Sequence, residues 1–171
     1  AAGVAVWHRP RRRPLPLPSA TPAVPAPPPP IVLEMPNRIS VLPVLSAAMD
    51  DALTAKSVPE RVRQDVTLIL EEVLSNTVRH GYAGESRDTI RVSANCEGPR
   101  LHLHFDDGGC EWNPLEHDLP DIDLSIEERD IGGLGVLLVR ELSESASYER
   151  KDGRNHLSLV LRLDTEEEAS A

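Results

Sequence analysis

The chain has 171 residues and a formal net charge of −10, from 18 lysines and arginines against 28 aspartates and glutamates. This length fits one domain with an ordinary core, and the excess of acid argues against a nucleic-acid backbone as the main partner. The two cysteines lack CxxC spacing, which fits a reducing cytosol, and no apolar run approaches the roughly 18 residues of a membrane span, so we expect no membrane partner.

Residues 1–30 are set apart by their composition. They hold ten of the sixteen prolines, four arginines and no acidic residue. Such a segment favours polyproline II and buries little surface, so we predict a disordered proline-rich extension. It is either a dispensable extension or a ligand for a proline-binding module. We expect one domain over 31–163, followed by a frayed acidic tail over 164–171.

The first predicted element is a short strand over 31–35, closed by Pro36. Asn37 is the expected N-cap of a helix that runs to about Ala55. Pro43 lies inside this pattern and should kink the helix or delay its start. The apolar face of this helix would consist of Ile39, Leu42, Leu45, Met49 and Leu53.

A second helix is predicted from about Pro59 to His80, with Gly81 ending it. Its apolar stripe, at helical spacing, would consist of Val62, Val66, Ile69, Leu70, Val73 and Leu74. Glu72 and Asn76 are four residues apart, so both project from one side along the border of that stripe. This pair either lines a cleft or belongs to an ordinary solvated helix flank.

Three later segments alternate apolar and polar residues as strands do, at 89–94, 100–106 and 155–163. A fourth strand, 145–150, would be joined to the last by the turn KDGR. Between them, 133–142 is a predicted helix entered through glycines. This order of elements predicts an α/β (α+β) two-layer sandwich in which helices cover one face of the sheet.

The stretch DDGGCEWNP, 106–114, directly follows the predicted strand 100–106. Continuing the alternation places Asp107 on the face toward the helices, where a buried carboxylate needs hydrogen-bond donors. The exocyclic amine of adenine would supply one, and Gly108 and Gly109 would let a base approach the backbone. An ordinary Asp-Gly turn is the alternative interpretation.

The stretch RDIGGLGVLLV, 129–139, has glycines at positions 132, 133 and 135 that open a helix. Unpaired N–H groups and the positive end of the helix dipole bind phosphates at such a place. The pattern is neither a Rossmann fingerprint nor a P-loop. Glycines that serve only close packing of the helix on the sheet are the alternative.

His102 and His104 project from the outward face of the predicted strand 100–106. Two histidines on one face can bind a metal ion. Without a nearby thiol, however, they are more typical of an exposed sheet face, and we expect the latter.

Taken together and in this order, these stretches resemble the ATP-binding boxes of the GHKL superfamily (gyrase, heat-shock chaperone, histidine kinase, MutL). The matching pieces are EEVLSNTVRHGY, DDGGCEWNP, EERDIGGLGVLLVRELSE and YERKDGRNHLSLVLRL. Within the superfamily the chain resembles the anti-sigma-factor serine/threonine kinases of bacterial partner-switching systems. The resemblance covers about residues 31–163. It implies an ATP-binding kinase domain of Bergerat-type fold, with a mixed, mostly antiparallel sheet and ATP between helices and sheet.

The resemblance also implies roles for single residues. Glu72 would be the general base for an incoming serine or threonine hydroxyl, or for water, and Asn76 would be the side-chain ligand to Mg²⁺. Asp107 would bind the adenine amine, and Gly109 would admit the base. The family's first glycine box often reads D-x-G-x-G, whereas this chain has Glu111 in place of the second glycine. The resemblance also implies a short lid over residues 115–131, and this departure bears on the mobility of that lid and on nucleotide affinity.

At the other end of the nucleotide, Gly133 and Gly135 would support the phosphates, and Arg129 would reach them. The resemblance predicts a cytoplasmic ATP-dependent protein serine/threonine kinase that uses ATP and Mg²⁺. It would hold a sigma factor or similar output protein inactive, and would phosphorylate an anti-sigma-factor antagonist. A non-catalytic, nucleotide-gated protein-binding module is the alternative, and Glu72 favours the kinase. The sequence does not determine the oligomeric state, and a homodimer is possible.

Overall fold

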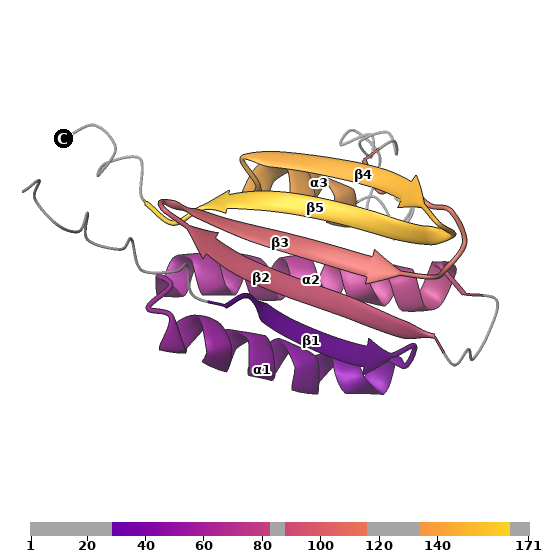
Figure 1. Cartoon of the computed structure of the whole chain (residues 1–171), viewed down its shortest axis with the longest axis horizontal. Coiled ribbons are helices and arrows are strands. Elements are labelled where there is room, and N and C mark those ends of the chain that lie inside the picture. The colour runs from indigo at the N-terminus through magenta and orange to yellow at the C-terminus, as the bar shows by residue number, and fades with distance from the viewer. Residues whose placement is uncertain (1–28, 83–87, 116–133, 165–171) are drawn as a thin grey trace, which may run out of the picture.

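The computed structural model describes residues 29–82, 88–115 and 134–164. These residues form a five-stranded sheet and three α-helices, and the helices all lie behind one face of the sheet (Figure 1). Buried apolar side chains from both layers meet in one core, so the predicted two-layer α/β sandwich with helices on one face is confirmed. Within the described ranges, no helix is long and apolar enough to cross a membrane.

The sheet has the order β1-β2-β3-β5-β4. Its strands are β1 (Ile31–Pro36), β2 (Thr89–Glu97), β3 (Arg100–Asp107), β4 (Ser145–Lys151) and β5 (Arg154–Arg162). The resemblance implies a mixed, mostly antiparallel sheet, whereas all four pairings described are antiparallel. Strand β5 lies between β3 and β4, so Asn155 at its start pairs with Asp107 at the end of β3.

The turn between β4 and β5 has the geometry that its sequence predicts. Asp152 and Gly153 both have positive φ, at 50° and 77°. Two consecutive residues of this kind are what a two-residue hairpin turn requires, because their twist matches that of the strands. The KDGR turn therefore fixes the register of β4 against β5, in which Arg150 pairs with Asn155.

The first helix starts later than the sequence predicts, and Asn37 is not its N-cap. The chain first forms a 3₁₀ turn, η1 (Ile39–Val41), and α1 (Leu42–Ala55) follows without a side-chain cap. Pro43 explains the delay, because proline lacks an N–H and is tolerated only in the first turn of a helix. Ile39 therefore lies outside the helical stripe and is 43% exposed. The rest of the predicted stripe is buried and consists of Leu42, Leu45, Met49 and Leu53.

The central helix is α2 (Glu60–His80), which begins after the extended residue Pro59. It lies between α1 and α3 (Leu134–Leu142), and it packs against both (Figure 1). All six residues of its predicted apolar stripe are buried. Asn76 and Thr77 are buried as well, so the covered face of α2 becomes polar in its last turns.

The buried stripe of α2 allows a direct test of the fold. Leu70 is fully buried and Leu68, two residues earlier, is 45% exposed. Leu70→Ala should destabilise the protein by about 2–5 kcal/mol, because it leaves a cavity in the core. Leu68→Ala should change the stability by less than about 0.5 kcal/mol. Urea unfolding of both variants checks this, and equal losses would contradict the placement of the helix.

Candidate functional site

Glu72 and Asn76 lie one turn apart on α2 and are hydrogen-bonded to each other. The amide nitrogen of Asn76 donates to Oε1 of Glu72 at 2.8 Å. Asn76 is 8% exposed and Glu72 is half-buried, whereas the neighbouring Glu71 is exposed. This geometry distinguishes the two adjacent glutamates, because only Glu72 contacts the buried amide.

Asp107 ends β3 on the face toward the helices, as the alternation predicts, and is only 8% exposed. Its Oδ1 accepts two hydrogen bonds, from the backbone N–H of Gly109 and from the side-chain amide of Asn155, both at 2.9 Å. Burial raises the pKa of Asp107 above its usual range, although these two donors oppose the shift. Among the described residues, none donates a hydrogen bond to Oδ2. One carboxylate oxygen is thus fixed and the other remains an acceptor.

Asn155 is a residue of the site that the sequence reasoning missed. It is 6% exposed, and its amide nitrogen also donates to the backbone carbonyl of Cys110. Its Oδ1 accepts from the Tyr148 hydroxyl and from Arg150, each at 2.7 Å. A signal was available: continuing the inward alternation of the last strand back from Leu157 places an asparagine on the buried face.

The turn after Asp107 is held directly against the end of α2. The N–H of Cys110 donates to the carbonyl of Gly81 at 2.6 Å. A Cβ at Gly109 would lie only 2.6 Å from that carbonyl oxygen and 2.8 Å from Oδ1 of Asp107. Asn76 is five residues before Gly81, about 7.5 Å along the helix. The structure thus brings the Asp107 turn and the Glu72–Asn76 pair to the same end of the domain.

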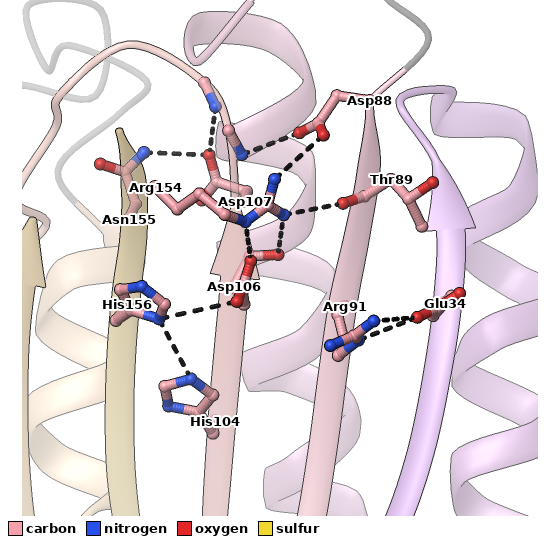
Figure 2. A network of polar contacts seen from close by, with 12 residues as sticks. Glu34, Asp88, Thr89, Arg91, His104, Asp106, Asp107, Arg154, Asn155 and His156 are labelled. Carbon is pink, nitrogen blue, oxygen red and sulfur yellow. Dashed lines mark hydrogen bonds and ion pairs between the residues drawn. The ribbon is translucent and has the colours of Figure 1, made fainter. Parts of the chain in front are cut away.

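A second set of polar contacts, also missed from the sequence, surrounds Gly108 (Figure 2). Its N–H donates to Oδ2 of Asp88 at 2.8 Å, and the Tyr82 hydroxyl donates to the same oxygen at 2.5 Å. Arg154 pairs with Asp88 at 3.1 Å and with Asp106. Burial opposes ionisation of Asp88, but the bonds from Tyr82, Gly108 and Arg154 outweigh it and lower its pKa. Burial, followed by the bond to Asp88, raises the pKa of Tyr82.

Of the three residues predicted to contact the phosphates, one lies within the described residues. Gly135 lies in the first turn of α3, which begins at Leu134. Gly133 and Arg129 lie outside the described residues. Glu111, which replaces a glycine of the family pattern, is exposed.

The sequence matches the family model described as histidine kinase-like ATPase domain over residues 35–161. The chain belongs to this family. Membership implies binding of ATP, and the matched range contains both the Glu72–Asn76 pair and the Asp107 turn.

One relative supports the assignment, and one solved structure has a similar fold. The chain is 31% identical over 100 residues to the serine/threonine-protein kinase BtrW of Bordetella bronchiseptica, an alignment that covers 58% of this chain and 70% of BtrW. Its fold is similar to a solved structure of the RsbU and RsbW domains of Rv1364c from Mycobacterium tuberculosis, with a TM-score of 0.58 and 21% identity. That match covers 81% of this chain but only 33% of the other chain. At this identity it shows the fold alone.

Because Gly109 lies so close to the end of α2, we expect alanine to destabilise the protein more at position 109 than at position 108. Gly109→Ala should destabilise the protein by about 1–3 kcal/mol, because the new Cβ would meet the backbone carbonyl of Gly81. Gly108→Ala should cost less, since its Cβ would meet only side-chain ends, at Asp88 and Arg154. Thermal unfolding compares the two, and a larger loss for Gly108→Ala would contradict the described contact.

The pKa of Asp107 predicts a dependence of stability on pH. Because this pKa is raised in the folded state, the ionised carboxylate lowers the free energy of unfolding at pH values above that pKa. The loss of stability disappears at pH values below the ordinary pKa of an aspartate, where the carboxyl is protonated in both states. Asp107→Asn keeps an oxygen acceptor for Gly109 and Asn155. It should therefore be at least as stable as the parent at neutral pH, with the advantage lost in acid.

Asp88→Asn is the matched control, because the pKa of Asp88 is lowered rather than raised. It should destabilise the protein at neutral pH, and this loss should shrink as the pH falls through the folded-state pKa of Asp88. Urea unfolding across the pH range measures both effects. Destabilisation of Asp107→Asn at neutral pH would contradict the expected cost of the buried charge.

Proposed function

We propose that the protein is an ATP-dependent protein serine/threonine kinase. The observation that carries this proposal is the hydrogen bond between Glu72 and the buried Asn76. Asn76 occupies one Glu72 oxygen and orients the carboxylate, and the half-buried position of Glu72 leaves it open to an incoming hydroxyl. Glu72 then acts as general base and takes the proton of a serine or threonine hydroxyl as that oxygen attacks the γ-phosphorus of ATP. The bond from the γ-phosphorus to the β–γ bridging oxygen breaks, and ADP leaves.

The adenine end of ATP is assigned to Asp107. Its Oδ2 accepts no hydrogen bond from the described residues, and it belongs to a buried group whose other oxygen is fixed by two donors. Asp107 Oδ2 is not among the fully enclosed atoms that lack a partner, so it can be reached from outside, and the exocyclic amine of adenine would supply it with a donor. In this assignment Gly109 keeps the turn close to α2 so that the base can lie beside it.

The residues present also fit Mg²⁺. Asn76 donates through its nitrogen to Glu72, so its carbonyl oxygen remains an oxygen ligand of the type that Mg²⁺ prefers. When bound, the ion would neutralise charge on the phosphates. We assign the phosphates themselves to Gly135, in the first turn of α3, and to Gly133, which precedes that helix in the sequence, with Arg129 as a further cation. N–H groups at a helix start bind anions.

The similarity to a serine/threonine-protein kinase supports a protein substrate. We assign the kinase domain to residues 31–163, with 1–30 as a separate extension and 164–171 as an acidic tail. The proposed partners are a sigma factor or similar output protein, which the domain sequesters in the cytoplasm, and an antagonist that it phosphorylates. A homodimer is compatible with this proposal.

The proposal is tested by replacing the base and its neighbour. Glu72→Gln keeps the side-chain shape and its bond to Asn76 but cannot accept a proton. It should bind ATP as the parent does and transfer phosphate to a co-encoded antagonist about 10²–10⁴-fold more slowly. Glu71→Gln, exposed and one residue away, should behave as the parent. Phosphate transfer is followed with radiolabelled ATP, and binding by calorimetry.

Two outcomes would overturn the assignment. If Glu71→Gln alone abolished transfer, the base would be misassigned. If the parent and both variants transferred no phosphate while ATP still changed the affinity for a co-encoded partner, the protein would be a nucleotide-gated binding module instead.

A further inference from the structure

The face of the sheet that the helices leave open carries a cluster of three metal-ligating side chains. His104 and Asp106 are two residues apart on β3, so both point to this open face. His156 on β5 pairs directly with Asp106 across the strands. Figure 2 shows the two histidine rings and the carboxylate turned toward one another. The pairing of β3 with β5 therefore places three possible metal ligands from two strands next to one another.

The ligand atoms lie close together, and two of the distances between them approach those of a metal site. Nδ1 of His156 lies 3.4 Å from Nε2 of His104 and 3.7 Å from Oδ2 of Asp106. One ligand atom from each of the three residues lies within 4.8 Å of the others. A tetrahedral zinc ion with bonds of about 2.0–2.1 Å holds its ligand atoms about 3.3–3.4 Å apart. Small side-chain rotations would bring all three onto one ion.

We propose that His104, Asp106 and His156 bind a divalent transition-metal ion, with Zn²⁺ as the ion that their chemistry fits best. Two imidazoles and one carboxylate form a ligand set that zinc accepts, with a further position left for water or an external ligand. That position would face the surface hollow that these histidines share with Glu149. Imidazole ligands favour Zn²⁺ over Mg²⁺, so this site is chemically distinct from the one assigned to Asn76.

The surroundings of the cluster orient its ligands. The second ring nitrogen of His104, Nδ1, is 2.9 Å from the hydroxyl of Ser158, which directs Nε2 toward His156. Arg154 pairs with Oδ1 of Asp106 and leaves Oδ2 toward His156. Hydrogen bonds of this kind from outside the ligand set fix ring orientation in protein metal sites.

The cluster is separate from the proposed nucleotide site, although Asp106 and Asp107 are adjacent. Successive residues of a strand point to opposite faces, so Asp107 faces the helices and Asp106 faces away from them. A metal at this cluster would link β3 to β5, the two strands whose pairing also positions Asn155 opposite Asp107.

Calorimetry of the full chain with ZnCl₂ as the only ligand tests the proposal. The parent should bind one equivalent of Zn²⁺ that both His104→Gln and His156→Gln lose. His102→Gln is the matched control, because His102 lies on the same strand face but outside the cluster, and it should bind as the parent does. Ser158→Ala should weaken binding by roughly tenfold or more.

A second measurement needs no variant. Zn²⁺ should protect His104 and His156, but not His102, from modification by diethyl pyrocarbonate, as read by mass spectrometry. The proposal is overturned if the parent binds no Zn²⁺, if the His104 and His156 variants bind as His102→Gln does, or if Zn²⁺ protects all three histidines equally or none.

Discussion

Burying the carboxylate of Asp107 at the end of β3 is unfavourable, and much of the surrounding structure serves to offset this cost. Two donors, the Gly109 N–H and the Asn155 amide, hold one of its oxygens. Each donor belongs to a different segment, so the same contacts fix the turn after β3 and the start of β5. Gly109 in turn lies so close to Gly81 that a Cβ would not fit between them. The carboxylate, the turn and the end of α2 therefore form one unit.

The same helix supplies the chemistry that we assign to this unit. The apolar stripe of α2 is buried against the sheet, and its last turns replace apolar residues by Asn76 and Thr77. This change places an amide in a covered position, where it must be hydrogen-bonded, and Glu72 accepts that bond. Packing and chemistry thus depend on the same helical rotation: any change that turned α2 would move both the core residues and the Glu72–Asn76 pair.

Local patterns predicted most of the fold, because the apolar periodicity of α2 and of the strands matches the side of each element that is buried. They failed at Asn37, which was predicted to be the N-cap of the first helix. Pro43 delays the start of α1 until Leu42.

Local patterns also missed Asn155, because its importance depends on its pairing with Asp107, a residue 48 positions away in sequence on a different strand. The contact of His104 with His156 has the same origin. Neither pair is visible until β5 is known to lie between β3 and β4. Glu72 and Asn76 could be singled out because their four-residue spacing is local, and Asp107 because the alternation along its own strand points it inward. The roles of all three stay predictions.

The central claim is that the buried carboxylate of Asp107 recognises the amine of adenine. Calorimetric comparison of ATP with inosine triphosphate tests it most directly, since the two nucleotides differ only at one edge of the base. Adenine has an exocyclic amine beside an unprotonated N1, and hypoxanthine has a carbonyl oxygen beside an N1–H. The account predicts that ATP binds about tenfold to a hundredfold more tightly, because the carbonyl would leave Oδ2 of Asp107 facing another acceptor in a buried place. Equal affinity for the two nucleotides would contradict it.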